Sequence, residues 1–172
     1  GSFLWRKDLG PAIERGIWYS PMIVYDLDGD GRAEVALKTG EGDPRIKSNE
    51  VNENDLPIPV RGDPPVYKDK VLTGPEYVSV LDGMTGEEIC RTDWISREHF
   101  STYNKASRNQ LCVAYLDGKT PCLIVERGTY GPIIVDAYQF RGGRLHKLWR
   151  WDNRNESRKY RAQGAHSMHA VD

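Results

Sequence analysis

The chain has 172 residues, a length typical of a single domain, and its composition of 38% hydrophobic and 28% charged residues is ordinary for a soluble globular protein. The net charge is −1, which gives no electrostatic reason to expect nucleic acid or an anionic membrane as a partner. No apolar run approaches the roughly 18 residues of a membrane-spanning helix, so no membrane span is expected.

Alternating and β-branched runs, separated by Gly, Asp and Pro, recur along the whole chain, and helix signals are poor. The runs predict strands at 20–26, 34–39, 76–81, 88–94, 110–116, 121–126, 133–139 and 144–151. A partial strand is predicted near 3–8 and another beginning near 166. Asp-Gly and Gly-Gly pairs between successive runs favour tight hairpins, because glycine adopts positive φ without steric cost.

These segments repeat. Trp5-Arg6-Lys7-Asp8 resembles Cys90-Arg91-Thr92-Asp93 and Trp149-Arg150-Trp151-Asp152, and each closes a unit. The predicted fold is all-β: part of a β-propeller with about two complete four-stranded antiparallel blades plus flanking strands. The blades are expected at about 17–95 and about 109–152, with the next blade starting at 166–172. The tryptophans at 5, 149 and 151 are interpreted as core or inter-blade packing.

Two further features remain open on sequence alone. Residues 41–75 form a long proline-rich insertion in the first blade, and loops of this length are either functional or disordered. The chain has an odd number of cysteines, namely Cys90, Cys112 and Cys122. Two of them, Cys112 and Cys122, are predicted to be diagonal neighbours on one hairpin. Free thiols are favoured over a disulfide.

One loop carries a strong metal-binding pattern. Three aspartates alternate along a glycine-containing turn and a glutamate follows, so their carboxylates can converge on one point, as hard Ca²⁺ requires. The expected ligands are Asp26, Asp28, Asp30, the Arg32 carbonyl and Glu34. No glutamate stands at the twelfth position and strands flank the loop, so it is not an EF-hand. The alternative is an acidic hairpin tip without metal. If calcium binds, a structural role is favoured over a catalytic one.

In a blade, the loops between the second and third strands share a face with the crossovers between blades, and the calcium loop lies on the opposite face. We expect a ligand on the loop-rich face. Candidate catalytic residues there are Lys38, Arg127 and His166, and candidate substrate-binding residues are Thr39, Glu41 and Tyr130. A cation at position 38 or 127 could neutralise a sugar carboxylate.

Each candidate has an alternative interpretation. Lys38 and Arg127 could instead form structural ion pairs between blades. Tyr130 could stack on a sugar or simply pack within its loop. His166 and His169 are expected on one strand, three apart, so they point to opposite faces and are poor joint metal ligands.

The ordered set of motifs resembles the rhamnogalacturonan lyases of polysaccharide lyase family 11. The residues that carry it are Met22 to Thr39, Ala114 to Gly118, Pro121 to Tyr130 and Ala162 to Ser167. The resemblance implies an eight-bladed propeller with several calcium ions, secreted or exposed at the cell surface (or periplasmic), from a pectin-degrading microbe. It implies β-elimination at the bond between rhamnose and galacturonate in an acidic plant polysaccharide.

The sequence departs from the family pattern at the expected ligand face. Trp18 stands where a histidine is expected, and Lys38-Thr39-Gly40-Glu41-Gly42-Asp43 replaces Lys-Thr-Ala-Asp-Gly-Thr. A non-catalytic, calcium-stabilised propeller that binds glycans or proteins is therefore the alternative to a lyase, and a purely structural fragment is a third possibility. Because all blades line a propeller axis, the chain without the remaining blades is expected to lack a complete active site.

Overall fold

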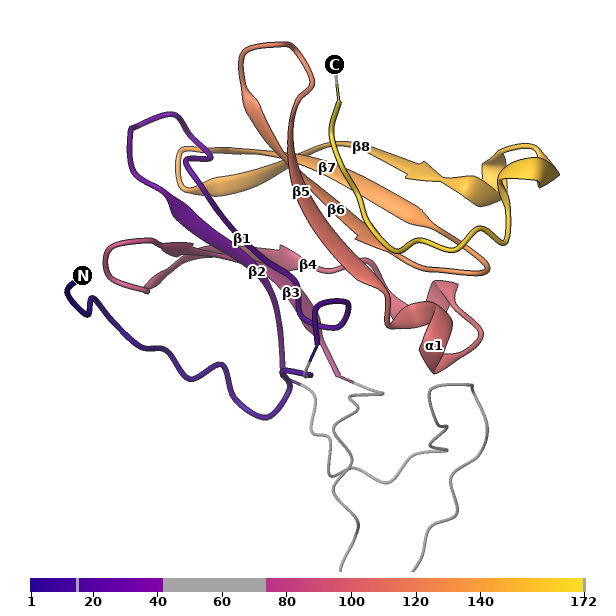
Figure 1. Cartoon of the computed structure of the whole chain (residues 1–172), viewed down its shortest axis with the longest axis horizontal. Coiled ribbons are helices and arrows are strands. Elements are labelled where there is room, and N and C mark those ends of the chain that lie inside the picture. Colours follow the sequence, from indigo (N-terminus) through magenta and orange to yellow (C-terminus); the bar gives the residue numbers. More distant parts are fainter. Residues whose placement is uncertain (15, 42–73, 172) are drawn as a thin grey trace, which may run out of the picture.

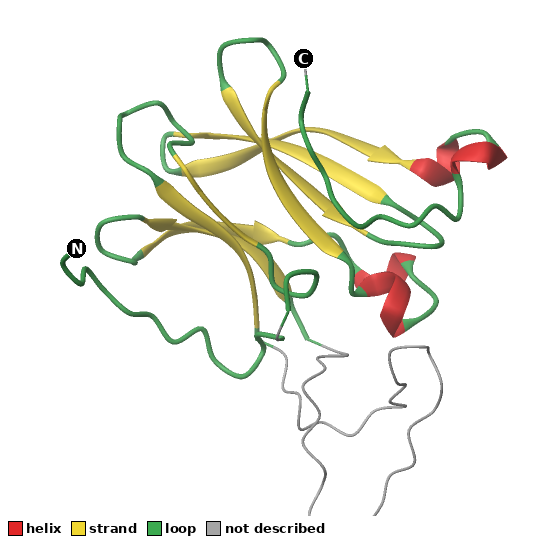
Figure 2. Cartoon of the chain, in the orientation of Figure 1, coloured by secondary structure: helices red, strands yellow, loops and turns green. Residues whose placement is uncertain are grey.

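The computed structural model describes residues 1–14, 16–41 and 74–171. It contains two four-stranded antiparallel sheets with the strand orders β1-β2-β3-β4 and β5-β6-β7-β8, as Figures 1 and 2 show. The first sheet consists of β1 (Met22–Tyr25), β2 (Glu34–Gly40), β3 (Glu76–Asp82) and β4 (Glu88–Asp93). The second consists of β5 (Asn109–Tyr115), β6 (Pro121–Arg127), β7 (Ile134–Arg141) and β8 (Arg144–Asp152). The prediction of an all-β fold is confirmed.

Short helical turns occur only in the connections of the described chain. A 3₁₀ turn (Arg97–His99) and α1 (Tyr103–Ala106) lie between the sheets, and two further 3₁₀ turns (Asn153–Asn155 and Arg158–Tyr160) follow β8. None of the described helices is long and apolar enough to cross a membrane.

The hairpin turns form as their sequences predict. Asp82 Oδ1 accepts hydrogen bonds from the N–H groups of Met84 and Thr85, both at 2.8 Å, and closes the turn between β3 and β4. Gly142 and Gly143 join β7 to β8 with φ of 57° and 69°. Two consecutive residues of positive φ are the requirement of a type I′ hairpin, which matches the twist of the strands it joins.

The main hydrophobic core lies between the two sheets. Val78 and Val80 from the first sheet meet Leu123 and Val125 from the second, and all four are at most 1% exposed. A second hydrophobic cluster, formed by Val35, Leu37 and Leu81, lies on the other face of the first sheet. A third, formed by Cys122, Ile124 and Ala137, lies on the other face of the second sheet. Each sheet is thus apolar on both faces, as a blade between two neighbours must be.

Two strand predictions are wrong for this chain: residues 3–8 and the segment from 166 form no strand. A strand needs a neighbour to take its backbone hydrogen bonds, and the described chain supplies none at these positions. Trp5 nevertheless packs as expected, because its indole covers Val35 and Leu37 while its Nε1–H donates to Gly83 O at 2.9 Å.

The three cysteines are free thiols. Cys112 pairs with Ile124 and Ala114 pairs with Cys122 in the register of β5 and β6, so the two thiols are diagonal neighbours. Both the predicted register and the favoured free state are confirmed. The prediction for the insertion at 41–75 falls almost wholly outside the described residues.

Chain connectivity places the loops at two ends. The β1–β2 and β5–β6 turns lie together at one end, while α1 and the β6–β7 loop lie at the other (Figure 1). The acidic loop and the predicted ligand face are therefore at opposite ends of the sheets.

Candidate functional site

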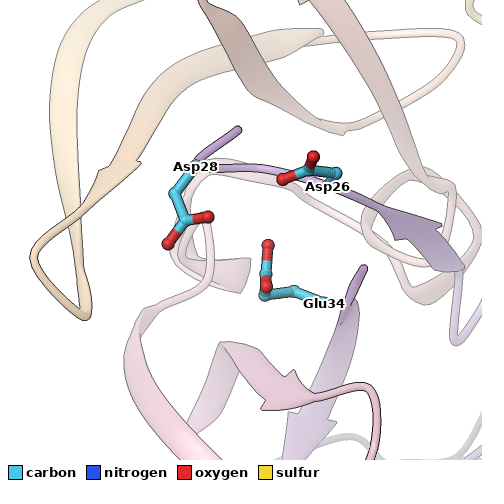
Figure 3. A group of neighbouring side chains, drawn as sticks. All are labelled: Asp26, Asp28 and Glu34. Atoms are coloured by element: carbon cyan, nitrogen blue, oxygen red, sulfur yellow. The ribbon is translucent and has the colours of Figure 1, made fainter. Parts of the chain in front are cut away.

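The acidic loop between β1 and β2 brings three carboxylates together. Asp26, Asp28 and Glu34 each offer an oxygen, and these oxygens all lie within 4.8 Å of one another (Figure 3). The loop backbone fixes two of them. Asp26 accepts from the N–H groups of Gly29 at 2.7 Å and Gly31 at 3.0 Å, and Glu34 Oε2 accepts from Leu27 N–H at 2.8 Å. Three convergent hard oxygen donors fit a calcium ion.

Like charges crowd this loop. Burial raises the pKa of Glu34, the Leu27 N–H opposes that effect, and the negative charges of Asp28, Asp30 and Asp26 raise it further. Asp30 lies outside the convergent group, and its Oδ1 accepts from the N–H of Arg32 at 2.8 Å. The structure thus brings together three of the four predicted carboxylates.

Glu76 is the centre of a buried ion cluster that sequence reasoning missed. Its carboxylate binds Lys38 Nζ at 2.7 Å, Arg97 Nη2 at 2.7 Å and Arg127 Nη1 at 2.6 Å. Lys38 is 3% exposed and Arg127 is wholly buried. Burial acts to raise the pKa of Glu76, but the charges of Arg127, Lys38 and Arg97 together outweigh it and lower the pKa to about 2.

Lys38 and Arg127 reach Glu76 from different sheets. Ala36 and Lys38 share the face of the first sheet that packs on the second, whereas Val125 and Arg127 share the face of the second sheet that packs on the first. Although both residues lie near the end of the second strand of their sheets, their side chains therefore point to opposite faces of the blade repeat. The Arg127–Glu76 pair joins the two blades, the alternative that the sequence left open, whereas the Lys38–Glu76 pair lies within the first sheet. A catalytic role of either cation remains a prediction.

Thr39 and Glu41 lie apart from this cluster. Thr39 Oγ1 is 2.7 Å from Ser79 Oγ, and Ser79 in turn donates to Glu88 Oε2 at 2.9 Å. Glu41 forms an exposed ion pair with Arg91 at 3.0 Å. Substrate binding by Thr39 and Glu41 remains a prediction.

Tyr130 and His166 are brought together at the loop-rich end. The Tyr130 hydroxyl lies 3.1 Å from His166 Nε2, and both side chains are exposed. Trp18 joins them edge-on, with its ring centroid 6.0 Å from that of His166. Tyr130 has φ of 51°, a left-handed conformation held by its N–H bond to Gln163 O at 2.8 Å. His166 lies in an irregular segment, so the strand expected for it is absent.

Glu126 is an unusual buried acid on the outer face of the second sheet. It is 3% exposed, and neither carboxylate oxygen has a hydrogen-bond partner among the described residues. Burial raises the pKa of Glu126 to about 9, and the positive charge of Arg127 opposes this effect. The only sequence signal is a glutamate that ends the apolar run from Cys122 to Val125.

Replacing Glu76 with Gln should destabilise the protein by about 3–5 kcal/mol near neutral pH, because the buried Lys38 and Arg127 and the partly buried Arg97 lose their shared carboxylate. An unfolded Glu titrates near 4.5, and the folded Glu76 titrates near 2. The stability that Glu76 contributes is therefore present above about pH 4.5 and is lost as the pH falls toward 2. Urea unfolding of wild type and E76Q across this range checks both points.

Glu41→Gln is the matched control, because the Glu41–Arg91 pair is exposed and should contribute below about 1 kcal/mol. If E76Q costs no more than E41Q, Glu76 does not organise the interface between the sheets.

Replacing Glu126 with Gln should stabilise the protein at neutral pH. The folded acid titrates near 9 and the unfolded one near 4.5, so wild-type stability falls as the pH rises between these values. At 1.36 kcal/mol per pH unit, the gain should be on the order of 3 kcal/mol at pH 7 and should vanish below about pH 4. Unfolding at pH 4, 7 and 8 tests this, with the exposed Glu87→Gln as control. A gain that is equal at all three values would contradict it.

The family model described as rhamnogalacturonan lyase family 11, C-terminal domain, matches residues 1–172. The chain is 36% identical over its full length to the rhamnogalacturonan exolyase YesX and 37% identical to the rhamnogalacturonan endolyase YesW, both of Bacillus subtilis (strain 168). It spans 28% of the length of each of these relatives.

Solved structures agree with the sequence comparisons. The crystal structure of YesW superposes with a TM-score of 0.71 over 92% of this chain and 27% of that one, at 37% identity. The rhamnogalacturonan lyase PL11 of Bacillus licheniformis gives a TM-score of 0.74 over 94% of this chain and 28% of that one, at 35% identity. The two sheets are accordingly blades of a β-propeller, and the chain belongs to rhamnogalacturonan lyase family 11.

Proposed function

We propose that this chain is part of a calcium-dependent polysaccharide lyase that cleaves rhamnogalacturonan by β-elimination between rhamnose and galacturonate. The observation that carries the proposal is the match of the whole chain to two rhamnogalacturonan lyases. Since the chain spans only 28% of their length, the remaining blades would complete the site. A substrate of this kind is an extracellular polymer, so we infer that the protein acts outside the cell, in the periplasm or at the cell surface.

β-Elimination from a uronate makes three demands: the carboxylate must be neutralised, its α-proton removed and the leaving oxygen stabilised. An unprotonated imidazole can take a proton and a phenol can give one. Tyr130 and His166 present both groups 3.1 Å apart on the exposed, loop-rich end. We infer that His166 is the candidate base and that Tyr130 contacts the sugar beside it.

Lys38 and Arg127 are harder to connect with the reaction. Both are buried and bound to Glu76, so a polymer could reach them only if that cluster opened. We infer that these two cations support the site by fixing Glu76 at the contact between the blades. Their direct catalytic role remains a prediction from the sequence, as does substrate contact by Thr39 and Glu41.

Calcium would be held by Asp26, Asp28 and Glu34, with the Arg32 carbonyl as a further predicted ligand. Bound calcium would supply charge neutralisation in an acidic turn and cross-link β1 to β2. The acidic loop and the Tyr130–His166 contact lie at opposite ends of the sheets, which supports a structural role for this ion rather than a part in the reaction.

The lyase proposal predicts that a protein carrying this chain together with its remaining blades will convert rhamnogalacturonan I to an unsaturated product. The rise in ultraviolet absorbance of the unsaturated uronate should depend on added calcium and be abolished by a chelator. His166→Gln should lower the rate at least tenfold, consistent with loss of a general base. A folded, calcium-loaded protein that gives no such product from any uronate polymer would favour the alternative, a propeller that only binds glycans or proteins.

The calcium proposal predicts that Ca²⁺ raises the melting temperature of the chain in a concentration-dependent way, because a ligand of the folded state stabilises it by mass action. Asp28→Asn removes one ligand charge and should weaken binding at least about tenfold in isothermal titration calorimetry. Asp117→Asn, in the corresponding turn of the second sheet, should leave the affinity unchanged. No heat and no thermal shift at millimolar Ca²⁺ would refute calcium binding at this loop.

A further inference from the structure

Arg108 differs from the other cations that lie between or beside the sheets. Lys38, Arg97 and Arg127 share Glu76, and Arg150 binds Asp136. Arg108, by contrast, forms no ion pair with any residue that the structure describes, and its Nε is buried without a hydrogen-bond partner. A guanidinium that is partly buried and has no anionic partner in the protein can gain a favourable interaction by binding the anionic group of a ligand.

The position of Arg108 is fixed from several sides. Its carbonyl accepts the N–H of Gly128 at 2.9 Å, and the N–H of the next residue, Asn109, donates to Trp18 O at 2.8 Å. The guanidinium carbon lies 4.4 Å from the centre of the Trp18 ring, a cation–π stack. Stacking restrains the plane of the guanidinium, so less conformational entropy is lost when its N–H groups bind a ligand.

Arg108 lies at the same end of the sheets as the Tyr130–His166 contact. Trp18 precedes β1, Arg108 precedes β5, and His166 follows the last strand, so three successive inter-blade segments meet there. A hollow of about 170 Å³ opens there. Trp18, Asn109 and His166 are among its lining residues, and Arg108 borders it through its stacking partner Trp18 and its chain neighbour Asn109. The hollow is smaller than the roughly 300–1,000 Å³ of a drug-sized ligand site, and suits one substituent of a longer chain.

We propose that Arg108, held by Trp18, is a binding residue for the carboxylate of a uronate unit in the acidic polysaccharide. This proposal rests on the proposed function only in taking an acidic polysaccharide as the ligand. A carboxylate matches the two-pronged donor geometry of a guanidinium, which neutral hydroxyl groups of a sugar do not.

The test uses the 172-residue chain labelled with ¹⁵N, with galacturonate as probe and galactose, which lacks the carboxylate, as its neutral counterpart. The Trp18 indole N–H resonance, assigned through W18F, reports binding. Galacturonate should shift this resonance in a saturable manner and galactose should not. R108Q should raise the dissociation constant at least tenfold, and R108K should fall between R108Q and wild type because Lys keeps the charge without the planar fork.

Arg141→Gln removes the same charge from the exposed end of β7 and should change the dissociation constant less than twofold. Equal responses to the two sugars, no response to either, or an R108Q variant that binds like wild type would each overturn the proposal. In the longer protein, R108Q should raise KM for rhamnogalacturonan more than it lowers kcat. A wild-type protein that forms no unsaturated product refutes the lyase function, while the galacturonate titration of the chain separately decides the role of Arg108.

Discussion

The two sheets meet around one carboxylate. Glu76 takes charge-assisted bonds of 2.6–2.7 Å from Lys38 of its own sheet, from Arg127 of the other and from Arg97 of the segment between them. A cluster of this kind is weak evidence for net stability, since each buried charge costs desolvation energy. Its effect is on geometry. Three cations that all bind one carboxylate allow very few relative positions of two blades, whereas the apolar core alone would tolerate small slips.

The same cluster positions the end of the molecule where a ligand would bind. Besides Glu76, Arg127 donates to Ile95 O at 2.7 Å and to Ala106 O at 2.5 Å, so it fixes both ends of the inter-blade connection. Arg108 comes two residues after the second of these anchors. Arg127 thus anchors the segment that leads to Arg108, the cation proposed to face the ligand.

Local pattern was enough to predict the eight strands, their turns and their grouping into two sheets, because period-two hydrophobicity and Asp-Gly or Gly-Gly turns are properties of adjacent residues. The Asp26–Glu34 loop was visible for the same reason. The Glu76 cluster, the free Arg108 and the neutral Glu126 were not, because each depends on which distant side chain comes close. The strands predicted at 3–8 and from 166 have the right pattern, but strand formation needs a hydrogen-bonding neighbour, and the described part of the chain supplies none at these positions.

The backbone of the loop-rich end is strained at Tyr130. A residue other than glycine with φ of 51° stores about 1 kcal/mol of backbone strain, and the preceding Gly128 allows no side chain because a Cβ there would lie 2.2 Å from Pro132 O. Glycine at position 130 would relieve the strain and at the same time remove the phenol beside His166. Selection for thermal stability and selection for the sugar contact proposed for Tyr130 would therefore favour different residues at this position, so stabilised relatives should be sought among proteins that lack the ring.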